Sequence, residues 1–219
     1  MTHTVHPYSF RLNMLRDWRS RWFGVSKKYK DLLKADIIIR EWLLKKMEKM
    51  YVEDIKIERL SSLAHIIITT SRPGLLIGRK GEGAENLKRA LKEKIKKLRL
   101  VDSDIKITVE EIREPEIYAS LTAKSVRDEL EKRRPFRKTL KNALEKSMAN
   151  KKIRGIKIAL SGRLDGADMG RREWLQKGKI PLQTLRSDIE FSRERAHLPY
   201  GDIGIKVWIY KGEKFAEKS

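Results

Sequence analysis

The sequence contains no cysteine and no long apolar run, and each absence excludes a class of protein. Without cysteine the chain forms no disulfide, no zinc site built on thiolates and no cysteine nucleophile, which fits a reducing compartment. No apolar stretch approaches the roughly 20 residues that a transmembrane helix needs. The N-terminus lacks the apolar core of a signal peptide. We therefore expect a cytoplasmic protein with no membrane partner.

Acidic residues are scarce relative to basic ones. The chain of 219 residues has 51 Lys and Arg against 30 Asp and Glu, a formal net charge of +21. A compact chain with that excess repels itself unless a polyanion screens it. Nucleic acid is the expected polyanion, and a membrane surface is the second choice. The chain is long enough for one large or two small domains.

A glycine-rich turn organises the first half of the chain. It contains Gly78-Arg79-Lys80-Gly81, a Gly-x-x-Gly motif with two cations between its glycines. Glycine permits tight turns and close backbone approach, and a turn that opens into a helix presents N–H groups that suit phosphate. Glu82 stands where a Walker A loop needs Ser or Thr, and the glycines lack the Rossmann spacing. We predict a contact with RNA backbone and no nucleotide triphosphate site.

Periodicity around this turn predicts a type II KH domain, a small α/β fold that binds single-stranded RNA or DNA. The expected order is helix, strand, strand, short helix, Gly-x-x-Gly, helix, strand, with a mixed three-stranded sheet. The residues that carry it are a helix over 27–50, strands over 54–60, 65–70 and 105–109, a short helix over 75–77 and a helix over 84–98.

The whole chain is expected to be α+β. After Pro115, two helical patterns meet at Pro135, and about four strand patterns follow, which predicts an antiparallel sheet. The expected domains are an N-terminal arm over 1–26, the KH domain over 27–114, a C-terminal α/β domain over 115–211 and a polar tail over 212–219.

The N-terminal arm interleaves basic and aromatic residues between Arg16 and Phe23. Arginine binds phosphate and stacks on bases, and aromatic rings stack as well. An equally good interpretation is that Trp18, Trp22 and Phe23 anchor the arm on the core, and both can hold. His3 and His6 are too few ligands for a metal site. We expect no metal and no cofactor.

A one-signed stripe of cations accompanies the second helix of the C-terminal half. Arg134, Arg137, Lys138 and Lys141 are spaced three or four apart, so on a helix they lie beside its apolar face. Glu145 is the only acid between residues 132 and 154. Helix surfaces normally mix charge signs, so the stripe favours RNA contact over an ordinary solvated face.

Taken together, these motifs resemble those of the bacterial ribosomal protein S three family. The similarity spans nearly the whole chain and keeps the motifs in order. They are Val5-His6-Pro7, Phe10-Arg11-Leu12, the segment 18–23, Arg72-Pro73-Gly74, Ile77-Gly78-Arg79-Lys80-Gly81, Phe136-Arg137-Lys138, Ser161-Gly162-Arg163-Leu164, Glu173-Trp174, the segment 181–186 and the segment 204–209.

The resemblance implies a structural protein in the head of the small ribosomal subunit. Such a protein binds ribosomal RNA, lines the channel through which mRNA enters, and helps to hold and passively unwind mRNA. The implied partners are small-subunit ribosomal RNA, mRNA and the neighbouring proteins S ten, S fourteen, S four and S five. The mRNA-facing cations map onto Arg137, Lys138 and Lys141. We expect ribosomal RNA contacts at His6, Arg11, Arg19, Arg21, Trp22, Arg72, Arg163, Arg171 and Arg172.

The sequence departs from the family at two places. Thr-His-Thr at residues 2–4 replaces the usual Gly-Gln-Lys. In the Ser161 loop, Asp165 and Met169-Gly170 replace the usual Gly and small apolar-Ala pair, and Asp165 puts a negative charge into this basic loop. We expect no phosphate contact at Asp165.

Two other functions are compatible with parts of the sequence. One is a free KH-type RNA-binding regulator. The other is a nucleic-acid-processing enzyme with Asp102, Asp104, Glu110 and Glu111 as metal ligands. Strand alternation would turn Glu110 and Glu111 to opposite faces, so we expect no catalytic residues and no enzyme.

Overall fold

The structure is a computed structural model that describes residues 5–60, 63–97 and 104–215, with the side chain of residue 97 excepted. The chain forms two compact units. We call Trp18–Arg113 the central unit, and Met1–Asp17 together with Glu114–Ser219 the terminal unit. The predicted N-terminal arm is divided between them, since its first 17 residues belong to the terminal unit.

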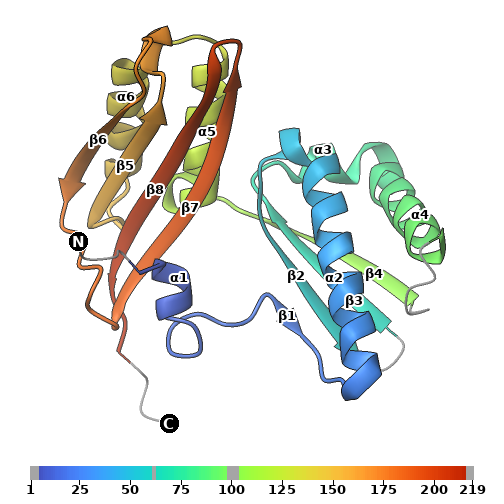
Figure 1. The fold of residues 1–219 in the computed structure, drawn as a ribbon. Helices are drawn as coiled ribbons and strands as arrows, with labels where there is room; N and C mark the ends of the chain where they lie inside the picture. The colour runs from blue at the N-terminus through green and yellow to red at the C-terminus, as the bar shows by residue number, and fades with distance from the viewer. Residues whose placement is uncertain (1–4, 61–62, 98–103, 216–219) are drawn as a thin grey trace. The chain divides into compact units, whose positions relative to one another are not determined.

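The central unit contains the predicted order of elements around a mixed sheet (Figure 1). Strands β2 and β3 are antiparallel, and β3 and β4 are parallel. The elements are β1 (Ser20–Arg21), α2 (Ser26–Lys46), β2 (Val52–Leu60), β3 (Leu63–Thr70), α3 (Pro73–Ile77), α4 (Glu82–Lys97) and β4 (Asp104–Glu111), with short 3₁₀ turns at Glu48–Met50 and Arg79–Gly81.

Strand β1 is an addition that sequence periodicity did not indicate. Ser20 lies opposite Ile57 of β2 in parallel register, and the Ile57 backbone N–H donates to the Arg19 carbonyl oxygen at 2.9 Å. The sheet therefore has four strands, in the order β1-β2-β3-β4, rather than three. A strand of two residues is too short to show an alternating pattern in the sequence. Only its pairing with a neighbouring strand defines it.

The core of the central unit lies between the sheet and the helices α2 and α4. Helix α2 contributes Ile39 and Leu43, and α4 contributes Leu87 and Leu91, each at helical spacing. Alternating isoleucines of β2 and β3 supply the facing surface. Leu98, which we expected to continue the stripe of α4, lies outside the described residues.

The terminal unit is a four-stranded antiparallel sheet with two long helices, as predicted (Figure 1). The strand order is β6-β5-β8-β7, and α5 and α6 pack on one face around the larger apolar core, while Ala159, Ile189, Trp208 and Tyr210 form a smaller separate cluster. The elements are α1 (Pro7–Phe10), α5 (Ala119–Glu131), α6 (Phe136–Met148), β5 (Gly155–Gly162), β6 (Arg171–Gly178), β7 (Ser187–Leu198) and β8 (Gly201–Glu213), with 3₁₀ turns at Pro115–Ile117 and Leu164–Gly166.

Two boundaries of the terminal unit differ from the prediction. Helix α6 begins at Phe136, with Pro135 as an extended cap, so Arg134 lies in the preceding connection and not on the helix. Proline disfavours helical geometry in the residue before it, so Arg134 does not continue the helical stripe. Strand β8 continues to Glu213, into the predicted tail, because Ser187 of the long strand β7 offers it a partner. Residues 216–219 lie outside the described residues.

Candidate nucleic-acid interface

Helix α6 holds three of the predicted cations outward. Its apolar residues Phe136 and Leu140 are buried in the core, so Arg137, Lys138 and Lys141 face solvent. The side chains of Arg137 and Lys141 are each 74% exposed. Each forms a long, solvent-exposed ion pair, Nη2 of Arg137 with Glu173 at 3.8 Å and Nζ of Lys141 with Glu145 at 4.0 Å. Exposed pairs of this kind contribute little, so the cations remain available to a polyanion.

Arg134 lies near these cations but is held differently. Its Nη1 atom is 3.6 Å from Oε2 of Glu129 on α5, and its side chain is 59% exposed. The structure therefore gives a cationic surface of three helix residues with one cation in the neighbouring connection, not a single helical stripe.

The Gly-x-x-Gly motif forms a tight turn between α3 and α4. Gly78 and Gly81 have φ values of 69° and 85°, and Lys80 between them has 53°. A Cβ on Gly83, the next glycine, would lie 2.6 Å from the Leu76 carbonyl oxygen, so only glycine lets the two helices approach this closely.

The cations of this turn are exposed, whereas the helix that follows contributes little positive potential. Arg79 and Lys80 both face solvent. Glu82 and Glu85 occupy the first turn of α4, where their carboxylates offset the positive dipole end. An anion at this turn would therefore depend mainly on the two cationic side chains.

The basic and aromatic segment before α2 divides its roles among its residues. The Nε1–H of Trp22 donates to Oδ2 of Asp36 at 2.7 Å, and its ring lies 5.1 Å from that of Tyr29, so Trp22 anchors the segment. Phe23 is 88% exposed and Trp18 is 58% exposed. The anchoring interpretation therefore describes Trp22, and the exposed rings keep the stacking interpretation open.

The neighbouring arginines of the central unit remain accessible. Arg19 lies 3.2 Å from Asp54 and Arg21 lies 3.7 Å from Glu58, and both arginine side chains are more than half exposed. Arg72 stacks over the Tyr51 ring at 4.3 Å from its centroid.

Arg11 is a correction, because its side chain is buried and occupied. The Nε–H donates to the Ser187 carbonyl at 2.6 Å, Nη1 to that of Pro7 at 3.1 Å, and Nη2 to that of Leu182 at 2.9 Å. The carbonyls of Pro181 and Thr184 also accept from Nη2. With only 1% of its surface exposed, Arg11 offers no donor to phosphate. Four of these five carbonyls come from residues 170 to 176 positions later, which no local pattern reveals.

The remaining predicted RNA contacts also differ in accessibility. His6 caps α1 through a 3.4 Å hydrogen bond from the Ser9 backbone N–H, and its ring lies edge-on to Phe191. Nε of Arg163 donates to the Ala167 carbonyl at 2.9 Å, which ties its loop together. Arg171 lies 3.2 Å from Glu173, and Arg172 is exposed. The exposed Arg171 and Arg172 are therefore the better placed of these residues for a polyanion.

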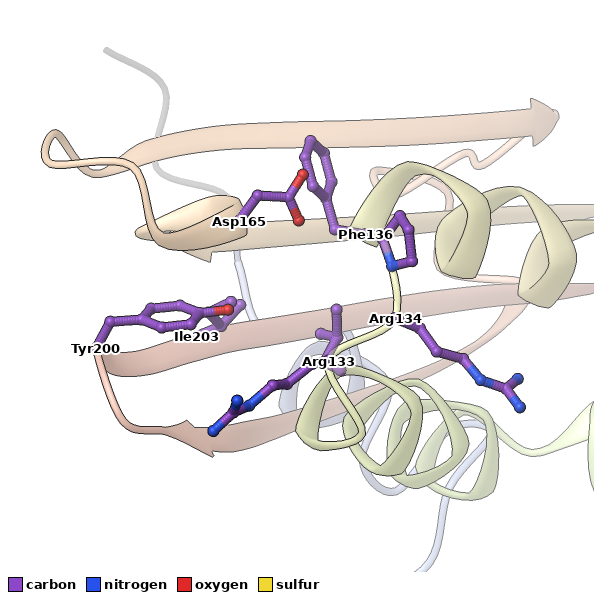
Figure 2. Close-up of a pocket in the computed structure, with 8 residues that line it drawn as sticks. Arg133, Arg134, Phe136, Asp165, Tyr200 and Ile203 are labelled. Atoms are coloured by element: carbon purple, nitrogen blue, oxygen red, sulfur yellow. The ribbon is translucent and has the colours of Figure 1, made fainter.

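A pocket of about 290 Å³ lies in the terminal unit, and the sequence did not indicate it (Figure 2). It forms where the connection between α5 and α6 meets the 3₁₀ turn after β5 and the turn between β7 and β8. Residues so distant in the sequence share no spacing that would place them together. The lining residues are Leu130, Arg133, Arg134, Pro135, Phe136, Asp165, Tyr200 and Ile203.

The acids considered as metal ligands do not converge on one point. Glu110 and Glu111 are consecutive residues of β4, so they face opposite sides. Nζ of Lys92 donates a hydrogen bond to Oδ1 of Asp104 at 2.9 Å. This hydrogen bond and the charge of Lys92 lower the pKa of Asp104. Asp102 lies outside the described residues.

Within the part of the chain that the structure describes, no group of three or more His, Asp or Glu side chains is arranged to hold a metal ion. In the same residues, no helix combines the length and apolarity that spanning a membrane requires.

Comparison with known proteins identifies both halves of the chain. Residues 38–117 match the family described as KH domain, and residues 126–209 match that described as Ribosomal protein S3, C-terminal domain. The small ribosomal subunit protein uS3 of Protochlamydia amoebophila is 45% identical over 97% of this chain and 96% of its own. The uS3 proteins of Hydrogenovibrio crunogenus and Nitrosomonas europaea are each 43% identical over 100% of this chain, covering 93% and 98% of theirs. This chain belongs to the uS3 family of small ribosomal subunit proteins.

Proposed function

We propose that the protein is a structural constituent of the small ribosomal subunit that binds ribosomal RNA in the cytoplasm. The observation that carries the proposal is the match to uS3 proteins over essentially the whole chain, at 43–45% identity. A net charge of +21 supports it, because ribosomal RNA is a polyanion. The chain is not an enzyme, since its family consists of structural ribosomal proteins.

The proposed RNA contacts follow accessibility. Exposed cations bind phosphate without a large desolvation cost, so we assign ribosomal RNA to the exposed surface of both units and to the Gly-x-x-Gly turn. Arg11 is excluded because it is buried, and Trp22 acts as an anchor. The proposed contacts are Arg19, Arg21, Arg72, Arg79, Lys80, Arg171 and Arg172, with a smaller share from His6 and Arg163.

Helix α6 is the proposed contact for mRNA at the channel through which it enters. Its three exposed cations lie on a rigid, packed helix, which suits a strand that moves past. Cations favour a single strand that follows them, so unwinding is passive and translocation supplies the work. The proposed neighbours are the proteins S ten, S fourteen, S four and S five.

Association with the small subunit tests the ribosomal role. We expect the tagged protein to sediment with small subunits and to stay bound through a high-salt wash, because many RNA and protein contacts hold an integral component. A free KH-type regulator would be released by the wash, since its binding depends on fewer phosphate contacts. Recovery of the protein only in the unbound fraction would contradict the proposal.

Removing the cations of α6 tests the mRNA contact. We expect the triple variant Arg137→Ala, Lys138→Ala, Lys141→Ala to fold normally and to slow translation through mRNA hairpins. For binding to single-stranded RNA, the slope of the logarithm of the binding constant against the logarithm of the salt concentration should become shallower by roughly 2 to 3, about one per lost phosphate contact. A matched control removes three exposed cations elsewhere in the terminal unit, Lys177, Lys179 and Lys206. Equal speed through hairpins in the variant, the control and the parent would refute the contact.

A further inference from the structure

We propose that the pocket at the α5–α6 connection binds one unpaired guanine base of an RNA strand, with Asp165 accepting hydrogen bonds from the base. The proposal deepens the proposed function and rests on it for the strand, which would follow the cations of α6. What it adds is base selection at a defined place in the terminal unit.

The dimensions and lining of the pocket suit a single base. A volume of about 290 Å³ lies at the lower end of the range for small-molecule sites, so the pocket holds one ring system rather than a folded RNA element. Tyr200 is the partly exposed aromatic residue of the lining, whereas Phe136, Leu130 and Ile203 are buried and form the apolar floor beneath it. Unstacked bases stack on accessible aromatic side chains, since every base has a π face, so Tyr200 is the stacking partner in this pocket.

Asp165 makes the pocket selective. Its side chain is exposed, and it makes no hydrogen bond or ion pair within the described part of the chain. An ionised carboxylate offers two acceptor oxygens and no donor. Guanine has two adjacent donors on its pairing edge, N1–H and the N2 amino group, which match the two oxygens. Adenine and cytosine have an acceptor beside their donor, and uracil has one N–H between two carbonyl oxygens. Each of these bases would therefore place a lone pair against a carboxylate oxygen, which is repulsive.

Arginines supply the charge that an RNA strand needs beside an acid. Arg133 and Arg134 leave the connection in opposite directions, and Asp165 lies across the pocket from Arg133 (Figure 2). Two arginines against one aspartate leave the lining with a net positive charge. Arg133 is exposed and has no side-chain partner among the described residues, so it is available to a phosphate beside the bound base.

The backbone also marks these two residues. Arg133 and Asp165 have φ values of 58° and 54°, in the left-handed region that residues other than glycine rarely adopt. Such conformations persist where the surrounding structure imposes them, and they gather at ligand sites. Here they place the carboxylate and the guanidinium at the same pocket.

The test compares base preference in the full chain and a matched pair of variants. A short oligouridine with one central guanosine should bind the parent protein on the order of tenfold more tightly than oligouridine alone, as one bidentate base contact provides. Asp165→Asn keeps the size and tolerance for the left-handed region but replaces one acceptor by a donor, and should bring the ratio close to one. Asp168→Asn removes the same charge from an exposed acid outside the pocket lining and should leave the ratio unchanged.

A mononucleotide separates failure of the pocket from failure of the RNA surface. Guanosine 5′-monophosphate should give stronger saturation-transfer signals with the parent protein than adenosine 5′-monophosphate, and Asp165→Asn should abolish the difference. Guanine preference without binding of oligouridine would contradict the α6 contact and keep the pocket. Binding of oligouridine with no guanine preference in either assay would overturn the pocket and keep the contact. A preference for adenosine or cytidine would also overturn it.

Discussion

Replacing Arg11 by alanine is expected to destabilise the terminal unit by about 3 kcal/mol or more, since each buried acceptor left without a donor costs about 1–3 kcal/mol. Five backbone carbonyls accept hydrogen bonds from this one guanidinium. Four of them belong to the segment from Pro181 to Ser187 at the start of β7, so Arg11 joins the N-terminal residues to the sheet. Alanine would remove this donor from all five carbonyls, of which that of Thr184 also accepts from the Ser187 backbone N–H at 3.2 Å.

The charge state of Arg11 does not weaken this expectation. Burial lowers the pKa of Arg11 from its ordinary value, and the nearby charge of Asp188 opposes the shift. A guanidinium stays protonated at neutral pH even so. The loss is therefore that of a charged donor, whose hydrogen bonds are stronger than neutral ones.

Hydrogen exchange of the β7 amides measures the effect, because it reports on this sheet separately from the central unit. Arg11→Lys keeps the charge but has one nitrogen in place of the planar fork, so its protection should fall between parent and alanine variant. Arg172→Ala deletes an exposed arginine of the same unit and should change protection by less than about 0.5 kcal/mol. Equal protection in Arg11→Ala and Arg172→Ala would show that the buried hydrogen bonds contribute nothing.

Replacing Asp36 by alanine is expected to destabilise the central unit by roughly 3–5 kcal/mol, as for other buried ion pairs that lose one partner. Oδ1 of Asp36 accepts from Nε and Nη2 of Arg59 at 2.9 and 2.7 Å. Its Oδ2 accepts from the Trp22 indole at 2.7 Å. Both side chains of the ion pair are at least 94% buried, with 6% of Arg59 and 4% of Asp36 exposed. The variant would remove the carboxylate that accepts two hydrogen bonds from this buried guanidinium.

Unfolding by denaturant, monitored through hydrogen exchange of the β2 amides, measures this loss of stability, because Arg59 belongs to β2. Asp31→Ala is the matched control, since it removes an exposed aspartate from the same helix α2. Trp22→Phe should cost about 1.5–3 kcal/mol, the value of one hydrogen bond to a charged group. Arg59→Met with Asp36→Leu, which removes both charges, should recover much of the loss. If Asp36→Ala and Asp31→Ala are equally stable, the buried pair does not stabilise the unit.

Local sequence patterns predicted the elements that bury one regular face. Alternating isoleucines identified β2, β3, β5 and β8, and helical spacing identified α2, α4, α5 and α6. The Gly-x-x-Gly motif identified the KH fold, which the match over residues 38–117 confirms. These predictions succeed because periodicity follows directly from burial of one face, whichever partner covers it. The two-residue strand β1 and the start of α6 depend on a partner strand and on one proline, so periodicity placed them wrongly or not at all.

The family, the excess of positive charge and the outward position of Arg137, Lys138 and Lys141 could all be predicted from the sequence. These features depend on composition or on residues close together in the sequence. For the three cations, spacing along one helix decides which side chains face solvent. The structure was needed to show that Arg11 is a buried connector, that Trp22 is an anchor, and that Asp165 shares a pocket with Arg133. Those roles depend on partners that folding brings together from distant positions, and the hydrogen-bonding demands of a buried side chain are met by whichever groups the fold places beside it.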